Sequence, residues 1–317
     1  MSAVIAEIDK YFDHILVHTG QNYDFELNEV FFNDLGVRKP DYFLEVAGSS
    51  AANTIGNIIS KSDVVFEKEK PDALLLYGDT NSCLSVISAK RRKIPIFHFE
   101  AGNRCFDLRV PEEINRKIVD HTSDINFTLT EHARRYLTME GIRPDKIFKT
   151  GSHMYEVIEN SKLEIDNSKV LIDLGLDKGK YFLVSIHREE NIDDIRNFNS
   201  LINILDHISN TYDMPIIVST HPRTRKMIDK SNIVKSDKIH YMKPFGFFDY
   251  IHLQKNAFCV LSDSGTISEE SAMMNFPAIS IRTSTERPEA IDFGAIILGG
   301  INQEDILNAI ETTLMTC

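Results

Sequence analysis

Short apolar segments rich in β-branched and aromatic residues alternate with amphipathic segments along almost the whole chain. Residues 73–78 (ALLLYG) and 181–186 (YFLVSI) are apolar on both faces of an extended chain, whereas residues 51–68 have helical spacing. Strands that are apolar on both faces and separated by helices are typical of parallel sheets covered on both sides. The pattern therefore predicts an α/β fold built from doubly wound parallel sheets.

The expected elements follow directly from this alternation. The predicted strands are 14–19, 73–78, 94–99, 125–129, 181–186, 215–220, 239–242, 257–262, 277–281 and 295–299. The clearest predicted helices are 2–11, 51–68, 112–122, 131–140 and 197–210.

A polar segment at 158–169 (IENSKLEIDNSK) interrupts the alternation and predicts a domain boundary. A chain of 317 residues is long enough for two domains with cores of their own. We expect one Rossmann-like domain over residues 1–160 and a second over 170–317, facing each other across a cleft. In such sheets ligands bind at the carboxyl ends of the strands.

The amino-terminal domain begins in an unusual way. Its first element is a helical pattern over residues 2–11, which leads directly into the predicted strand at His14. A doubly wound domain normally opens with a strand and a glycine-rich turn before that helix. The sequence therefore predicts that the first strand of this domain is missing.

Charge and cysteine content limit the classes of partner. A net charge of −12 argues against nucleic acid, whose binding needs a basic face. No apolar run approaches the ~20 residues of a membrane-spanning helix. The four cysteines are widely spaced, with no CxxC pair, which favours the reducing cytoplasm and argues against disulfides and a zinc site.

Four predicted strands are followed by polar residues that a simple turn does not require. The segments are GDTN (78–81), EAGNR (100–104), HREEN (187–191) and SDSGT (262–266). Each one taken alone is equally well explained by helix capping, because Asp, Asn and Ser side chains accept orphan backbone N–H groups. Four such segments on the side where these sheets bind ligands favour a site.

The residue types in these segments suit proton transfer beside a phosphate group. Asp79, Glu100 and Glu112 would raise one another's pKa values in a shared cleft, making one carboxyl a proton donor and another a base. His187 and Arg188 would face them and neutralise a departing phosphate.

These segments, in this order and spacing, resemble the non-hydrolysing UDP-N-acetylglucosamine 2-epimerase family. The resemblance rests on GDT, EAGNR with PEEINR, HREEN, DSGTISEE and TERPEA, and it covers nearly the whole chain. It implies two Rossmann-like domains of the glycosyltransferase-B type, usually in a homodimer, with a UDP-sugar as substrate and neither a redox cofactor nor a metal. It also implies elimination of UDP to a 2-acetamidoglycal, followed by re-addition with the opposite configuration at C2.

The resemblance also assigns roles to individual residues. Asp79, Glu100 and Glu112 match the residues of proton transfer, and His187 matches the histidine that assists UDP departure. The matched substrate-binding residues are Arg104, Arg188, Tyr250 (uracil), Ser264 and Gly265 (phosphate turn), Glu270 (ribose) and Arg287 (a nearby charge).

The substrate and the reaction type have several candidates. GNRCFD, THPRT, KPFGFFDY and DSGTISEES look more like the subgroup that makes UDP-N-acetyl-L-fucosamine for capsule or O-antigen. The alternatives are an epimerase that makes UDP-N-acetylmannosamine, a hydrolysing epimerase, a glycosyltransferase of the same fold and a shortened, inactive UDP-binding remnant.

Overall fold

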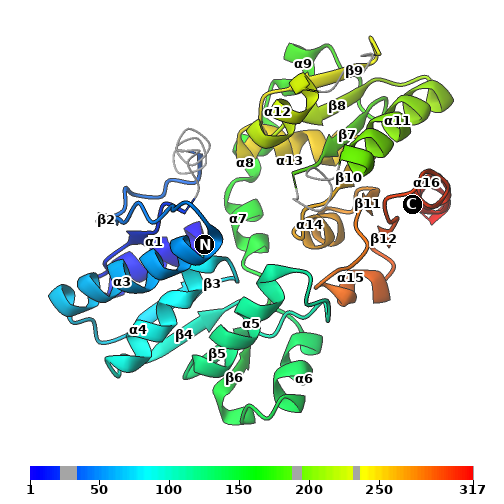
Figure 1. Ribbon diagram of the computed structural model, residues 1–317. Coiled ribbons are helices and arrows are strands. Elements are labelled where there is room, and N and C mark those ends of the chain that lie inside the picture. Colours follow the sequence, from blue (N-terminus) through cyan, green and yellow to red (C-terminus); the bar gives the residue numbers. More distant parts are fainter. Residues whose placement is uncertain (22–33, 188–194, 231–235, 317) are drawn as a thin grey trace. The chain divides into compact units, whose positions relative to one another are not determined.

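A computed structural model describes residues 1–21, 34–187, 195–230 and 236–316, which form two compact units, Met1–His153 and Met154–Cys317 (Figure 1). Every strand pairing among the described residues is parallel, and helices connect most of the strands. The predicted α/β class with two Rossmann-like domains is confirmed. The polar segment at 158–169 lies inside the second unit, where it contributes to helices α7 (Met154–Asn160) and α8 (Lys162–Asp166).

Unit 2 contains one six-stranded sheet in the order β12-β11-β10-β7-β8-β9. Its strands are β7 (Phe182–Ser185), β8 (Ile216–Ser219), β9 (Ile239–Met242), β10 (Cys259–Ser262), β11 (Ala278–Ser280) and β12 (Ile297–Leu298). Its other helices are α9 (Val170–Leu174), α11 (Ile195–Tyr212), α12 (Pro222–Lys230), α13 (Phe247–Asn256), α14 (Ile267–Met274), α15 (Pro288–Asp292) and α16 (Gln303–Thr316).

Successive residues of the unit 2 strands enter different cores. Phe182 and Val184 of β7 pack in a cluster with residues of α11 and α16, whereas Leu183 packs in a second cluster with residues of α13 and α14. This explains why the strand sequences are continuously apolar. The strand order reverses between β7 and β10, and such a reversal is where open parallel sheets bind ligands.

Unit 1 carries its strands in two separate sheets. A four-stranded sheet has the order β3 (Leu74–Tyr77), β4 (Ile96–Phe99), β5 (Ile125–Thr128), β6 (Ile147–Lys149), and β1 (Val17–His18) pairs with β2 (Tyr42–Phe43). The helices are α1 (Ser2–Tyr11), α3 (Ala51–Glu69), α4 (Val86–Arg91), α5 (Pro111–Thr122) and α6 (Glu131–Met139), with 3₁₀ turns η1 (Asn81–Ser85) and η2 (Pro144–Lys146). The first element is helix α1, as predicted. Within the described residues, no backbone pairing joins β1 to β3.

Candidate active site

Two of the predicted acid–base residues follow neighbouring strands of unit 1. Asp79 comes after β3, and Glu100 comes directly after β4. Glu100 has φ = +67°, a left-handed conformation that is strained for a residue with a side chain. A Cβ atom added to Gly78 would lie 3.2 Å from Glu100 Oε2, so the Glu100 carboxyl group covers the turn that carries Asp79. The structure therefore places the two residues at the carboxyl ends of adjacent strands, with the Glu100 carboxyl group beside the turn of Asp79.

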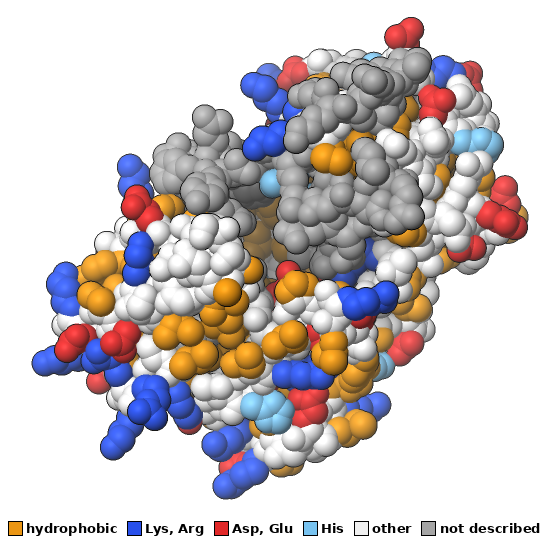
Figure 2. All heavy atoms as spheres, viewed as in Figure 1, with side chains coloured by type: hydrophobic (Ala, Val, Ile, Leu, Met, Phe, Trp, Pro, Cys, Tyr) orange, Lys and Arg blue, Asp and Glu red, His pale blue; other side chains and the backbone are white. Residues whose placement is uncertain are grey.

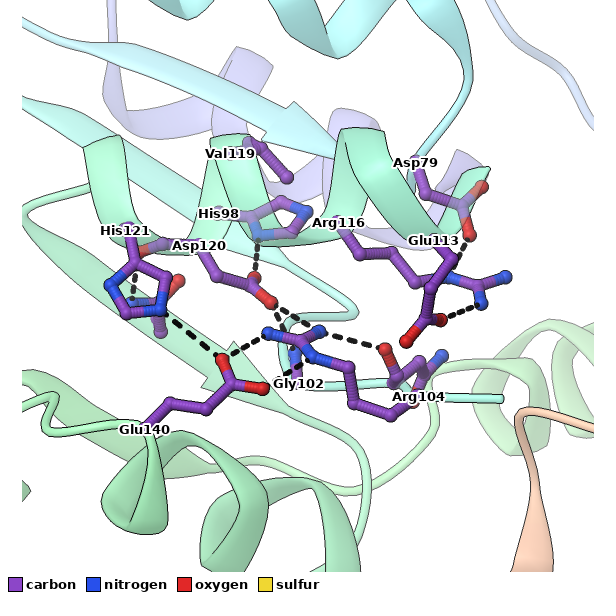
Figure 3. Close-up of polar contacts among 12 residues, drawn as sticks. Asp79, His98, Gly102, Arg104, Glu113, Arg116, Val119, Asp120, His121 and Glu140 are labelled. Atoms are coloured by element: carbon purple, nitrogen blue, oxygen red, sulfur yellow. Dashed lines mark hydrogen bonds and ion pairs between the residues drawn. The ribbon is translucent and has the colours of Figure 1, made fainter. Parts of the chain in front are cut away.

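Helix α5 holds Asp79 in place. The Arg116 Nε atom donates to Asp79 Oδ2 at 2.7 Å, and Asn115 Nδ2 donates to the Asp79 carbonyl at 3.0 Å. Arg116 is itself almost fully buried and forms a second ion pair with Glu113 at 3.0 Å (Figure 3). Sequence reasoning missed both Glu113 and Arg116. The i, i+3 spacing of Glu113 and Arg116 in PEEINR was the available signal.

The two glutamates of the PEE segment have different environments. Glu113 is fully buried and accepts hydrogen bonds from the backbone N–H groups of Cys105 and Phe106, at 3.0 and 3.2 Å. Glu113 therefore anchors the loop before α5. Glu112, one residue earlier, is half-buried in the first turn of the helix. The contacts between Asp79 and α5 run through Asn115 and Arg116 rather than through Glu112.

Arg104 does not occupy the position that we predicted for a substrate-binding residue. Its side chain is fully buried, and it donates to Asp120 Oδ2 at 2.8 Å and to both carboxylate oxygens of Glu140 at 2.8 and 2.7 Å (Figure 3). The guanidinium group is directed into the interior of unit 1 by these two partners. We therefore correct the prediction, because Arg104 stabilises the fold beneath the strand ends.

In unit 2, His187 and Asp263 meet at the point where the strand order reverses. His187 follows β7, and Asp263 follows β10, the adjacent strand. The fully buried Asp263 carboxylate accepts from the His187 backbone N–H at 3.1 and 3.0 Å, and its Oδ1 lies 3.1 Å from His187 Nδ1. This contact fixes the imidazole and leaves Nε2 for a ligand. Sequence reasoning missed Asp263, although it directly follows a buried strand.

The Ser264–Gly265 turn precedes helix α14 and packs against the TERPEA segment. A Cβ atom on Gly265 would lie only 2.5 Å from Glu286 Oε1, so a larger residue there requires Glu286 to move. Arg287, which is largely buried, pairs with Glu269 in the first turn of α14. The structure thus places Ser264, Gly265 and Arg287 in one region.

Glu270 is buried next to this turn, and Tyr250 is half-buried. Burial raises the pKa of Glu270, while hydrogen bonds from Gln254 and Thr266 act in the opposite direction. The Gln254 Nε2 atom lies 2.6 Å from Glu270 Oε2. Burial and the Glu270 charge raise the pKa of Tyr250, and hydrogen bonds with Ser185 and Ser262 oppose them. Tyr250 therefore lies beside the ends of β7 and β10 and close to Glu270.

Arg188, the remaining predicted contact, lies outside the described residues. Among the residues that the structure describes, no helix is both long and apolar enough to cross a membrane. That same part of the chain holds no group of three or more His, Cys, Asp or Glu side chains suited to a metal ion.

Comparisons with known proteins give consistent matches. A family model described as UDP-N-acetylglucosamine 2-epimerase matches residues 6–316. A solved UDP-N-acetylglucosamine 2-epimerase from Rickettsia bellii has a TM-score of 0.92 and 55% identity, over 99% of this chain and 84% of that one. The Methanocaldococcus jannaschii UDP-GlcNAc 2-epimerase, in complex with UDP-GlcNAc and UDP, has a TM-score of 0.91 and 35% identity, over 99% of this chain and 88% of that one. A Methanococcus maripaludis UDP-N-acetylglucosamine 2-epimerase is 37% identical over 324 residues, covering 99% of this chain and 88% of the relative.

Proposed function

The chain belongs to the UDP-N-acetylglucosamine 2-epimerase family and is an isomerase, and on that premise we propose that it inverts C2 of a UDP-N-acetylhexosamine without hydrolysing it. The observation that carries this proposal is the position of Asp79 and Glu100 on adjacent strand ends of unit 1. Two carboxyl groups at adjacent strand ends can act as a base and an acid.

The proposed reaction is an elimination followed by an addition. One carboxylate takes the C2 proton, the C2–H electron pair forms the C1=C2 bond, and the C1–O bond breaks with its electrons on UDP. UDP then adds back to C1 of the 2-acetamidoglycal while an acid delivers a proton to the opposite face of C2. We assign the two proton transfers to Asp79 and Glu100. Glu112, half-buried at the start of α5, remains a third candidate.

We assign UDP to unit 2. The N-terminus of α14 presents backbone N–H groups and the positive end of the helix dipole, which suit a pyrophosphate. Ser264 and Gly265 form the turn before this helix, and His187 would stabilise the charge that develops on UDP. Glu270 is the candidate for the ribose hydroxyls, and Tyr250 is the candidate for uracil. Arg287 is the candidate for a positive charge near the pyrophosphate.

UDP-N-acetylglucosamine is the first substrate to test, because the relatives compared above carry that name. The second is UDP-2-acetamido-2,6-dideoxy-L-talose. Segments 102–107 (GNRCFD) and 243–250 (KPFGFFDY) favour it through their resemblance to the L-fucosamine subgroup, which would place the protein in capsule or O-antigen synthesis.

Incubation with each UDP-sugar in deuterated water tests the proposal directly. We expect deuterium at C2 of the recovered nucleotide sugar and a mixture of the two C2 epimers. Folded protein that leaves C2 unlabelled with both sugars would contradict the proposal. Release of free UDP with free sugar would indicate a hydrolysing epimerase, and glycosylation of an added acceptor would indicate a glycosyltransferase.

Asp263→Asn is expected to lower kcat by about 10- to 10²-fold, because an amide orients and stabilises a cationic imidazole less well than a carboxylate. Asp166→Asn is the matched control in unit 2, since its ion pair with Lys255 is partly exposed. Asp263→Asn introduced into a His187→Ala protein should lower kcat little further. A full additional loss in that background would show that Asp263 acts independently of His187.

We also propose a homodimer that uses the face of α4 and α5 in unit 1. Figure 2 shows hydrophobic side chains gathered on this face, and the exposed ones include Ile87, Ile114 and Ile118. Exposed apolar patches of this kind mark protein contacts, and most soluble oligomers are symmetric dimers.

Light scattering should give twice the chain mass of 36.1 kDa for the unaltered protein. Ile118→Asp should give the mass of a single chain, whereas Ile172→Asp on the exposed face of α9 should not change the dimer. A monomeric unaltered protein would contradict the proposal.

A further inference from the structure

His98 is a buried histidine for which the proposed reaction has no direct use. It lies in β4, and its side chain is 1% exposed. Its Nε2 atom lies 3.0 Å from the Gly78 carbonyl oxygen, and its Nδ1 atom lies 2.8 Å from Asp120 Oδ1. A carbonyl oxygen only accepts hydrogen bonds, so Nε2 must carry a hydrogen.

Whether His98 Nδ1 carries a hydrogen then depends on whether Asp120 is ionised. The second oxygen of Asp120 accepts from Arg104 at 2.8 Å and from the Gly102 backbone N–H at 3.2 Å (Figure 3). Burial opposes ionisation of this carboxyl, but the His98 and Arg104 contacts outweigh it and lower the pKa of Asp120. An ionised carboxylate has no hydrogen to give, so Nδ1 must also be the donor.

We infer that His98 is a buried imidazolium ion that positions the two strand-end turns carrying Asp79 and Glu100. The protonation state follows from the hydrogen bonds of the ring together with the ionised state of Asp120, whereas the positioning role rests on the proposed function.

The charges around His98 balance within one cluster. The cations are His98 and Arg104, and the anions are Asp120 and Glu140. Glu140 accepts two hydrogen bonds from Arg104. Buried charges are tolerated only when they are paired and their donors and acceptors are satisfied. An imidazolium at this position meets that condition.

The cluster is connected to the segments that carry Asp79 and Glu100 by hydrogen bonds to their backbone. His98 binds the carbonyl of Gly78, the residue before Asp79, and Asp120 binds the N–H of Gly102, two residues after Glu100. Gly102 has φ = +83°, and a Cβ atom there would lie 2.5 Å from the Ala133 carbonyl oxygen. One ion pair therefore sets the spacing of two turns that belong to different strands. A catalytic group displaced by about 1 Å can lose about 10²-fold in rate.

The first experiment measures the protonation of His98 in the unaltered protein. Protein labelled with ¹⁵N-histidine is examined by long-range ¹H–¹⁵N correlation at neutral pH, with the His98 signals assigned by their loss in His98→Gln. We expect both ring nitrogens to show the shifts of a protonated imidazolium. One protonated and one unprotonated nitrogen would overturn the inference, whether or not the protein catalyses C2 exchange.

The second experiment measures positioning. His98→Gln is expected to lower kcat by about 10- to 10²-fold while KM changes by less than about threefold, because substrate contacts are retained and the reacting groups are displaced. The matched control is His121→Gln, since the half-exposed His121 touches only the outer end of the cluster, 3.2 Å from Glu140 Oε2.

An unchanged kcat in His98→Gln would overturn the positioning role. If the unaltered protein shows no hydrogen exchange at C2 of the UDP-sugar, the proposed function is contradicted. The result on the protonation of His98 does not depend on that outcome. If His98→Gln fails to fold, hydrogen exchange at the Asp79 and Glu100 backbone amides of the unaltered protein provides the readout. Rapid exchange at both would also overturn positioning.

Discussion

Glu100→Gln is expected to lower the rate of C2 hydrogen exchange by about 10³- to 10⁴-fold, at the upper end of what one acid–base group contributes. Glutamine keeps the size of the side chain, and its carbonyl can still accept from Asn103, whose Nδ2 atom lies 3.4 Å from Glu100 Oε1. It cannot take up or deliver the proton. The measurement is deuterium incorporation at C2 under saturating UDP-sugar.

The matched control for this prediction is Glu67→Gln, since Glu67 is a mostly exposed residue of α3 in the same unit. The affinity for UDP, measured by calorimetry, should be unchanged in Glu100→Gln, because we assign UDP to residues of unit 2. A Glu100→Gln protein that keeps more than about a tenth of the activity would remove Glu100 from the proton transfer.

Asp120→Ala is expected to lower the free energy of unfolding of unit 1 by about 3–5 kcal/mol, because it leaves buried cations without their partner. The substitution removes the acceptor of His98 and one acceptor of Arg104, and it leaves the Gly102 N–H unpaired. Urea unfolding, followed by hydrogen-exchange mass spectrometry of unit 1 peptides, measures the change.

Asp145→Ala is the matched control for Asp120→Ala. Asp145 also pairs with an arginine, at 2.8 Å from Arg143, but both side chains are exposed. Exposed pairs contribute about 0–1 kcal/mol, so a loss below about 1 kcal/mol is expected. Equal losses in the two variants would show that the buried cluster does not stabilise unit 1.

The Asp120 contribution has a defined pH dependence. Because the folded protein lowers the pKa of this carboxyl from 3.8, the stability it adds is present above about pH 3.8 and is lost as the pH falls through the folded value. The difference between the unaltered protein and Asp120→Ala should therefore shrink only under strongly acidic conditions. A difference that shrinks near neutral pH would contradict the assignment.

Local patterns were sufficient to predict the fold class and most of the strands. Continuous apolar runs mark β7, β8 and β10 because these strands are buried on both faces, and the same reasoning located β3, β4 and β5. Two short strands were not predicted. β2 has only two residues, and two of the three residues of β6 are exposed, so neither has an apolar run as long as those of the predicted strands.

The strand-end positions of Asp79, Glu100, His187 and Ser264 were also readable from the chain, since a polar residue directly after an apolar run marks the end of a strand. Folding alone distinguishes side chains with similar local surroundings. Glu112 and Glu113 are identical neighbours, yet only Glu113 is enclosed by the loop at Cys105 and Phe106.

Distant partners explain the remaining errors. In the sequence, Arg104 lies in a segment predicted to be a loop. In the structure, its side chain is buried because it binds Asp120 and Glu140, which are 16 and 36 positions away. Asp263 lies 76 positions from His187 and meets it only because β7 and β10 are adjacent in the sheet. Hydrophobic spacing is a property of neighbouring residues, so it can be read from the sequence. The pairing of buried charges depends on which strands and helices meet, and it is determined only when the chain has folded.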